Sequence, residues 1–327
     1  MTGPGPGPPV VADDLLVYAV PLRARFRGID VREGVLVRGP AGWGEFSPFR
    51  EYDDAEAVAW WTAAREAADW GWPPPVRERI PVNATVPAVE PDDVAAVLAG
   101  FPGCRTAKVK VAAAGQSPDD DESRLAAVRA VLGPGGRIRV DANGAWDVDT
   151  AARLLRRYDV AAGGLEYAEQ PCPGVEDLAA LRRRVDVPIA ADESIRRAGD
   201  PMEVARQEAA DVAVLKVQPL SGVRACLRIA ESIGLPVVVS SALETSVGIA
   251  AGVALAAALP ELPYACGLAT AGLLERDVVG EPLLAVDGSL AVRRPAPTAA
   301  ALAAARADDA TLAWWRDRAT RVARLAA

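Results

Sequence analysis

Histidine is absent from this chain of 327 residues. Its absence excludes Ser-His-Asp and Cys-His nucleophiles, acid–base chemistry by imidazole, and histidine metal ligands. The four cysteines lie far apart and form no CxxC pair, so we interpret them as small core residues in a reducing compartment. Any metal must therefore be held by oxygen ligands.

A surplus of basic residues is also missing. The formal net charge of -8 argues against a nucleic-acid partner and favours a small-molecule substrate. Residues 1–9 lack the charged and apolar regions of a signal peptide, and the longest apolar run, residues 248–259, is too short to span a bilayer. We therefore expect a cytoplasmic protein without a membrane partner. The sequence leaves the oligomeric state open.

Two different sequence patterns follow one another along the chain. Residues 15–48 contain short strands separated by glycine turns, and Asp53 or Asp54 begins a helix that ends before three consecutive prolines. Eight apolar strands then alternate with helices rich in Ala, Arg and Leu, and these strands begin near residues 80, 106, 137, 165, 188, 212, 236 and 263. This alternation predicts a parallel sheet covered on both faces, and eight such units predict a closed barrel.

Charged residues interrupt the ends of five successive strands that should be apolar. They are Lys108 and Lys110, Asp141, Glu169, Asp192 and Lys216. Taken singly, an aspartate could cap a helix, the glutamate could pair with an arginine, and a lysine could extend to solvent. However, the strand ends are 23 to 31 residues apart, which is the length of one βα repeat. The side chains should therefore converge on the mouth of the barrel, where barrel enzymes place their chemistry.

The three carboxylates and the lysines indicate one type of reaction. Carboxylate oxygens on adjacent strands are the ligands that Mg²⁺ prefers, with Mn²⁺ a plausible substitute. Lys108 and Lys110 point the same way, so burial and like charge should lower a lysine pKa towards the range of a base. Lys110 and Lys216 should face each other across the mouth, where they could remove the proton α to a metal-bound carboxylate while the metal neutralises the enediolate.

Two further residues share the phase of Asp141. Asn143 lies two residues after it and Arg139 two residues before it, so both should face the same cavity. We interpret them as substrate contacts. Each could instead hydrogen-bond to neighbouring carboxylates of the barrel.

An ordered set of motifs resembles a known family. The motifs are KxK at 108–110, DAN at 141–143, EQP at 169–171, DES at 192–194 and the lysine at 216. Together they resemble the muconate-lactonizing-enzyme subgroup of the enolase superfamily. Within it, the stretch PLRARFRGIDVREGVLVRGPAGWGEFSPF at 21–49 resembles the o-succinylbenzoate synthase family of the menaquinone pathway.

The resemblance implies a fold and a domain division. The fold is an α/β one, a modified (β/α)-barrel with an α+β capping domain built from both chain ends. We expect the N-terminal part of the capping domain at residues 1–79, the barrel at 80–270, and a returning C-terminal segment at 271–327. In that segment a hairpin turn is predicted at Asp287 and Gly288.

The resemblance also implies residue roles. Asp141, Glu169 and Asp192 would bind Mg²⁺, and Lys110 would remove the α-proton of 2-succinyl-6-hydroxy-2,4-cyclohexadiene-1-carboxylate. The same lysine would then protonate the departing hydroxide in a syn dehydration, which makes the chain a lyase. Lys216 would stabilise the intermediate as a cation, and Lys108 would bind the substrate carboxylate.

Other positions match the family's pocket. Ser240, Ser241 and Gly267 would line it, and Arg27 would meet a second substrate carboxylate. Small residues crowded at barrel ends and solvated loop arginines are ordinary alternatives.

Two other functions remain open at this point. The same two lysines would serve an N-acylamino acid racemase or a dipeptide epimerase. An inactive barrel that acts as a binding protein is the alternative of a different class, and the six charged positions argue against it, because buried lysines are costly to keep.

Overall fold

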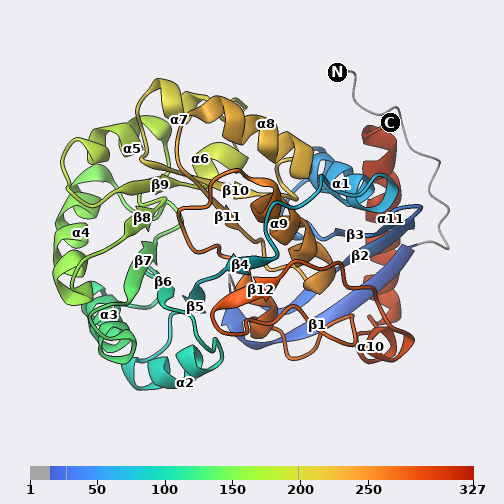
Figure 1. Cartoon of the computed structure of the whole chain (residues 1–327), viewed down its shortest axis with the longest axis horizontal. Coiled ribbons are helices and arrows are strands. Elements are labelled where there is room, and N and C mark those ends of the chain that lie inside the picture. The colour runs from blue at the N-terminus through green and yellow to red at the C-terminus, as the bar shows by residue number, and fades with distance from the viewer. Residues whose placement is uncertain (1–14, 27, 198) are drawn as a thin grey trace.

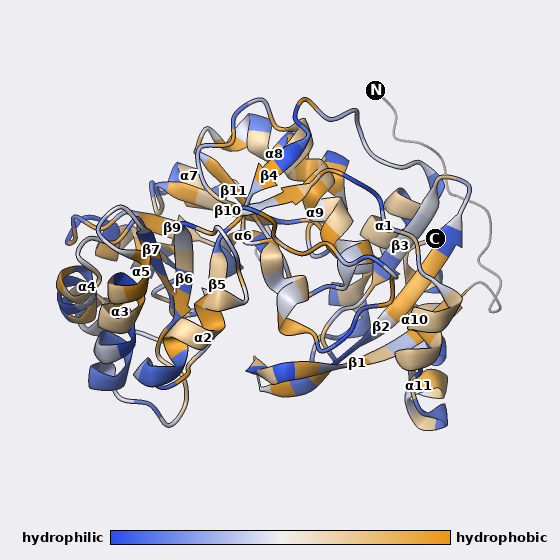
Figure 2. Ribbon diagram, turned by 60° about the horizontal axis from the view of Figure 1, so that its bottom comes forward, coloured by the Kyte–Doolittle hydropathy of each residue, from blue (hydrophilic) through white to orange (hydrophobic). Residues whose placement is uncertain are grey.

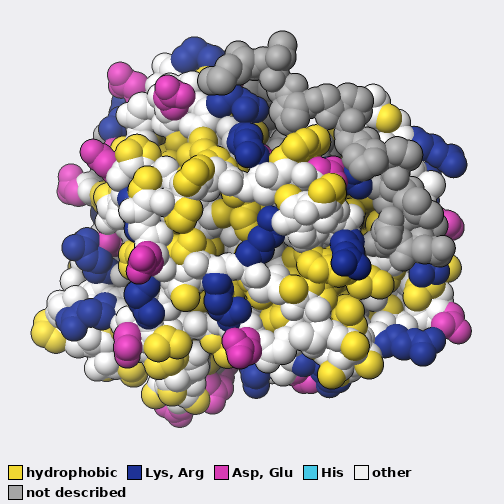
Figure 3. All heavy atoms as spheres, turned by 45° about the vertical axis from the view of Figure 1, so that its right-hand side comes forward, with side chains coloured by type: hydrophobic (Ala, Val, Ile, Leu, Met, Phe, Trp, Pro, Cys, Tyr) yellow, Lys and Arg dark blue, Asp and Glu magenta, His cyan; other side chains and the backbone are white. Residues whose placement is uncertain are grey.

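The computed structural model describes residues 15–26, 28–197 and 199–327 (Figure 1). Arg27 and residues 1–9, on which two expectations above depend, lie outside the described residues. Within the described ranges, no helix is both long enough and apolar enough to cross a membrane. Figure 3 shows a surface on which acidic, basic and hydrophobic side chains are interspersed, as is usual for proteins in water.

A small α+β unit is built on an antiparallel sheet of the order β1-β2-β3. Its strands are β1 (Leu15–Phe26), β2 (Ile29–Gly39) and β3 (Gly42–Phe46). Helix α1 (Asp54–Asp69) follows, and the side chain of Asp53 accepts a hydrogen bond from the backbone N–H of Glu56. This cap confirms the predicted start of the helix.

The C-terminal helices pack on the same unit. These are α10 (Ala299–Ala304) and α11 (Asp309–Leu325), and Figure 1 shows α11, in red, beside the blue strands. Phe46 of β3 meets Trp315 of α11 and Trp61 of α1 edge to face, with ring centroids 6.0 Å and 5.3 Å apart. Both chain ends therefore share one hydrophobic core, which we call the capping unit.

Seven parallel strands form the barrel sheet, in the order β11-β10-β9-β8-β7-β6-β5. They are β5 (Ala84–Val86), β6 (Thr106–Lys110), β7 (Arg137–Asp141), β8 (Tyr167–Glu169), β9 (Ile189–Ala191), β10 (Val212–Lys216) and β11 (Val237–Ser240). The helices of this part are η2 (Pro91–Asp93), α2 (Val94–Ala99), α3 (Pro118–Leu132), α4 (Val148–Ala162), α5 (Val175–Arg182), α6 (Glu193–Arg196), α7 (Glu203–Arg206), α8 (Val223–Ile233) and α9 (Ser246–Ala258). In Figure 2 the outer helices α3 and α4 carry both blue and orange residues, as expected of helices with one face on a core.

The eighth predicted strand is only two residues long. Cys266 bridges to Val82 and Gly267 bridges to Ser240, both in the parallel sense. The ring closes at these two residues, and the short helix η3 (Ala269–Leu273) follows at once. The eighth strand is short because the chain enters helix η3 directly after it.

The first predicted barrel strand is split in two. Its first part, β4 (Arg79–Pro81), pairs antiparallel with β12 (Ser289–Ala291), and only β5 belongs to the barrel sheet. The predicted turn before β12 is confirmed, since Asp287 and Gly288 have φ values of 50° and 68°. Apart from one bridge, however, the strand after the turn pairs with β4 rather than with the preceding segment.

Strand register places three of the charged residues side by side at the mouth of the barrel. Lys110 pairs with Asp141, and Asp141 pairs with Glu169, on neighbouring strands. Three strands separate β6 from β10 in the sheet order, so Lys110 and Lys216 lie on opposite sides of the ring. The fold therefore places one amine on each side of a group of carboxylates.

Candidate active site

The six charged side chains converge on the mouth of the barrel. Lys108 and Lys110 come from β6, Asp141 from β7, Glu169 from β8, Asp192 from the residue after β9, and Lys216 from β10. Five of them are buried and Lys110 is partly buried. The cavity above them is lined by Phe26, Thr85, Lys108, Lys110, Asp141, Asn143, Arg196, Lys216, Ser240, Ser241, Ala242, Leu243, Gly267 and Thr270. Buried charges at this density require partners.

The β6 lysines are paired with carboxylates on the next two strands. The ammonium group of Lys110 lies 2.5 Å from Oδ2 of Asp141 and donates to Oδ1 of Asn143 at 2.9 Å. Lys108 donates to both carboxylate oxygens of Glu169 at 2.8 Å and lies 3.1 Å from Asp141. These contacts leave the amine of Lys110 nearer to the cavity than that of Lys108.

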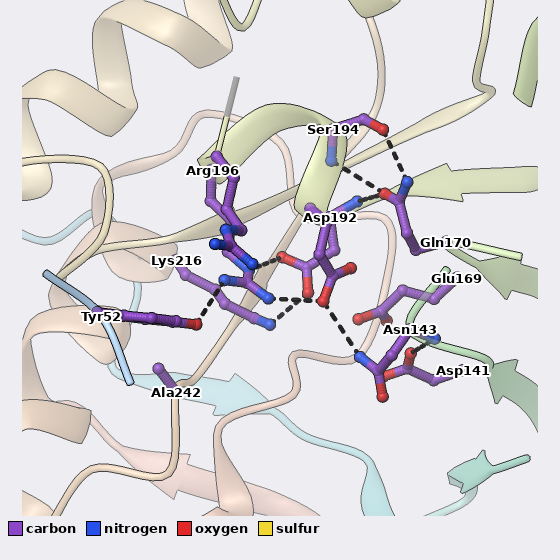
Figure 4. A network of polar contacts seen from close by, with 12 residues as sticks. Tyr52, Asp141, Asn143, Glu169, Gln170, Asp192, Ser194, Arg196, Lys216 and Ala242 are labelled. Atoms are coloured by element: carbon purple, nitrogen blue, oxygen red, sulfur yellow. Dashed lines mark hydrogen bonds and ion pairs between the residues drawn. The ribbon is translucent and has the colours of Figure 1, made fainter. Parts of the chain in front are cut away.

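Asp192 is held from two sides (Figure 4). Nζ of Lys216 lies 2.5 Å from its Oδ2, and Nε of Arg196 donates to its Oδ1 at 3.0 Å. Arg196 also donates to the hydroxyl of Tyr52 at 3.1 Å and to Oε1 of Glu193 at 2.6 Å. Neither Arg196 nor Tyr52 was predicted from the sequence. The spacing of four residues between Asp192 and Arg196 was a usable signal for the first, but no motif indicated the second.

Burial and neighbouring charges shift the pKa values of Glu169 and Asp192 in opposite directions. Burial, followed by repulsion from Asp141, raises the pKa of Glu169 to about 7, although Lys108 opposes this shift. Burial alone would also raise the pKa of Asp192, but attraction to Lys216 outweighs it and holds that pKa at about 2. A negative charge on Glu169 is therefore the least well compensated of the three.

The two β6 lysines also differ. Burial lowers the pKa of Lys110, and this effect exceeds the opposing attraction of Asp141. For Lys108 burial acts in the same direction, but Glu169 and Asp141 outweigh it and raise the pKa well above its ordinary value. The expected lowering of a lysine pKa is therefore found at Lys110 alone of the pair.

The carboxylates fit a hard divalent cation in chemistry. Asp141, Glu169 and Asp192 offer only oxygen donors, and the buried Oε2 of neighbouring Glu193 has no hydrogen-bond partner within the described part of the chain. No three acidic or thiol side chains among the described residues stand close enough together to form a finished metal site. Instead, the carboxylates point towards the ammonium groups of lysines, which neutralise part of their negative charge. Three carboxylates that offer oxygen donors alone are suited in chemistry to Mg²⁺ or Mn²⁺.

Four predicted substrate contacts line the cavity. They are Asn143, Ser240, Ser241 and Gly267. The hydroxyls of Ser241 and Thr270 share a hydrogen bond of 2.7 Å. A Cβ at position 267 would lie 2.6 Å from Oγ of Ser240 and 3.3 Å from its Cβ, so close packing already favours glycine there. Contact with substrate remains a prediction for all four residues.

The expectation that Arg139 faces this cavity is corrected by the structure. Inward residues two apart on a barrel strand lie in successive layers, and Arg139 lies one layer below Asp141. Its side chain is fully buried and donates to Glu166 at 2.5 Å, to Asn83 at 3.1 Å and to the carbonyl of Ala265 at 2.7 Å. Arg139 therefore ties β7 to neighbouring strands inside the barrel.

Replacing Arg139 with methionine should lower the free energy of unfolding by about 3 kcal/mol, because a buried ion pair loses one partner. We expect the KM of the folded variant to stay unchanged. Urea denaturation and steady-state kinetics would measure both effects. A raised KM with unchanged stability would instead assign Arg139 to the substrate.

The site contains every lysine of the chain. Lys108, Lys110 and Lys216 are the only three lysines in the sequence, and all other basic residues are arginines. An arginine side chain stays charged, whereas a buried lysine can release its proton. Every side-chain amine of the chain is therefore at this site, where an amine with a lowered pKa, such as that of Lys110, is able to exchange a proton.

A larger hollow of about 800 Å³ opens at the opposite end of the barrel, near the start of β11. Its lining includes Leu235, Val237 and Tyr264, with two glutamates, Glu231 and Glu261, and no lysine. Because barrel enzymes react at the carboxyl ends of the strands, we assign the active site to the mouth.

Known proteins resemble this chain over most of its length. The chain matches the family models "Enolase N-terminal domain-like" over residues 17–68 and "Enolase C-terminal domain-like" over residues 93–298. An o-succinylbenzoate synthase of Thermobifida fusca (strain YX) is 64% identical over 89% of this chain and 95% of its own length. The o-succinylbenzoate synthase of Mycobacterium ulcerans (strain Agy99) is 56% identical over 96% of this chain and 95% of its own.

A solved structure gives the same fold. The muconate lactonizing enzyme from Pseudomonas fluorescens, complexed with muconolactone, matches with a TM-score of 0.73 and 23% identity over 92% of this chain and 97% of that one. At this identity the likeness concerns the fold alone. Membership in the matched families implies a divalent metal. With both domain models and these relatives matched, the chain belongs to the enolase superfamily and, within it, to the o-succinylbenzoate synthase family.

Proposed function

We propose that this chain catalyses the o-succinylbenzoate synthase reaction, the Mg²⁺-dependent syn dehydration of 2-succinyl-6-hydroxy-2,4-cyclohexadiene-1-carboxylate to 2-succinylbenzoate in menaquinone biosynthesis. The chain is then a hydro-lyase that acts on a small carboxylate. The observation that carries the proposal is the position of Lys110 and Lys216 on opposite sides of a mouth with three buried carboxylates. The relatives of 64% and 56% identity support the choice of substrate.

Lys110 performs both proton transfers. Its neutral amine takes the proton from the ring carbon that bears the carboxylate, and the electron pair of the C–H bond moves into the carboxylate group. The electron pair then returns from the carboxylate group to form a new ring double bond, while the C–O bond to the ring hydroxyl breaks and its own electron pair leaves with the oxygen. The Lys110 ammonium returns its proton to that oxygen, so water departs from the same face and the ring becomes aromatic.

The other two lysines act as cations. Lys216 lies on the other side of the barrel mouth from Lys110, and it stabilises the negative charge that develops on the substrate after the first proton transfer. Lys108 lies behind Lys110 on the same strand, hydrogen-bonds the substrate carboxylate and repels the charged form of Lys110.

Asp141, Glu169 and Asp192 are the residues that would hold Mg²⁺. When bound, the cation supplies a Lewis acid that neutralises negative charge on the substrate carboxylate. Oxygen-only donors on adjacent strands are the type of ligand that suits Mg²⁺. Mn²⁺ should replace it.

Variants of Lys216 test the proposed reaction. Because dehydration needs the charge of this residue and not its proton, Lys216→Arg should keep kcat within about tenfold, whereas Lys216→Ala should lower it by about a hundredfold. Kinetics of dehydration would measure both variants. If Lys216→Arg were as inactive as Lys216→Ala, Lys216 would transfer a proton, as a racemase or epimerase of N-acylated substrates requires.

A further inference from the structure

Arg196 connects the capping unit to the candidate metal site. It lies on α6 at the barrel mouth, and its side chain is only 4% exposed. Each of its three guanidinium nitrogens has a partner. Nε donates to Asp192, and one terminal nitrogen donates to the hydroxyl of Tyr52 (Figure 4). The other terminal nitrogen donates to Glu193. Tyr52 lies between β3 and α1, so this chain of contacts crosses between the two units.

We infer that Arg196 is a positioning residue that orients Asp192 for the cation, and that Tyr52 fixes Arg196 from the capping unit. This inference rests on the metal site of the proposed function. The contact at Oδ1 of Asp192 leaves Oδ2, now paired with Lys216, as the oxygen available to a cation. Partners that orient a metal ligand typically change metal affinity by about 10- to 100-fold.

A direct role in substrate binding fits the contacts of Arg196 less well. The side chain lines the cavity, but three of its five N–H donors are already bonded to Asp192, Glu193 and Tyr52. A substrate carboxylate that turned the guanidinium towards itself would take a charged donor away from two carboxylates at the mouth of the barrel. The existing contacts therefore favour positioning.

The hydroxyl of Tyr52 can be removed without disturbing its packing. Its ring meets Phe49 and Trp60 with centroids 5.7 Å and 5.9 Å apart, and its backbone carbonyl accepts a hydrogen bond from Arg318. These contacts remain when tyrosine becomes phenylalanine. The change removes one hydrogen bond to Arg196 and leaves the charge of the site unaltered.

Binding of Mn²⁺ to the purified full chain, followed by electron paramagnetic resonance, tests the inference. We expect Tyr52→Phe to weaken Mn²⁺ binding by about 3- to 10-fold and Arg196→Lys by at least about 10-fold, because both variants keep the charge but lose fixed geometry. Tyr158→Phe is the matched control. It loses a hydroxyl contact of 3.0 Å between α4 and Asp121 of α3, outside the ring of strands, and should bind Mn²⁺ like the parent chain.

Three results would overturn the inference. Equal Mn²⁺ affinity in the parent and in Tyr52→Phe would show that the contact does not affect the ligand. Unchanged Mn²⁺ affinity with a raised KM in Arg196→Lys would assign Arg196 to substrate binding. A parent chain that binds no Mn²⁺ would remove the metal site itself, and with it the proposed function. Thermal unfolding of each variant separates these outcomes from loss of folding.

Discussion

Removal of divalent cations with EDTA should abolish turnover, and added Mg²⁺ should restore it. Loss of the proton α to a carboxylate places a second negative charge on that group, beside three buried protein carboxylates. Lysines neutralise these carboxylates in part, but the raised pKa of Glu169 indicates that negative charge remains uncompensated there. A dehydration assay in chelator and after add-back measures the effect, and full activity in chelator would contradict it.

Two controls belong to this experiment. The chelated protein should unfold at nearly the same temperature, because ion pairs with lysines hold the carboxylates without a metal. Mn²⁺ should also restore turnover, whereas Ca²⁺ should restore little, because it prefers six to eight oxygen ligands at longer distances. Unfolding in chelator would mean that the lost activity reports on stability instead.

Replacing Lys110 with alanine should lower kcat by about a thousandfold or more, because the variant lacks the group that takes and returns the proton. Burial lowers the pKa of this lysine, so a larger fraction carries the neutral amine near neutral pH than in a free lysine. The Mn²⁺ affinity should be retained, since Asp141 loses a competing ammonium group. Rapid-mix or steady-state kinetics with saturating Mg²⁺ would give the value.

Lys110→Arg provides the matched variant. It keeps a positive charge near Asp141 but cannot release a proton, so it should be as inactive as the alanine variant. Loss of a general base usually lowers kcat by much more than tenfold. If either variant kept more than about a tenth of the parental kcat, Lys110 would therefore not be that base.

Much of the fold and of the site could be predicted because βα repeats place the end of every strand at one mouth. Lys110, Asp141, Glu169 and Lys216 interrupt apolar strands at repeat spacing, and the register aligns the first three side by side. The same periodicity misplaced Arg139. Alternation along a strand tells which residues point inward, but not in which layer of the barrel they lie.

Contacts between the two units could not be predicted from the sequence. Tyr52 and Arg196 are 144 residues apart in the sequence, and their contact depends on how the capping unit packs on the barrel. The eighth strand was also overestimated, because its two bridging residues are set by the neighbours at Val82 and Ser240 rather than by its own apolar run.

The most direct test is to give the purified chain 2-succinyl-6-hydroxy-2,4-cyclohexadiene-1-carboxylate and, separately, a set of N-succinyl amino acids, with Mg²⁺ present. Formation of 2-succinylbenzoate would be followed by absorbance and racemisation by optical rotation. We predict fast dehydration that requires Mg²⁺ and Lys110. Fast racemisation without dehydration would contradict the proposed function.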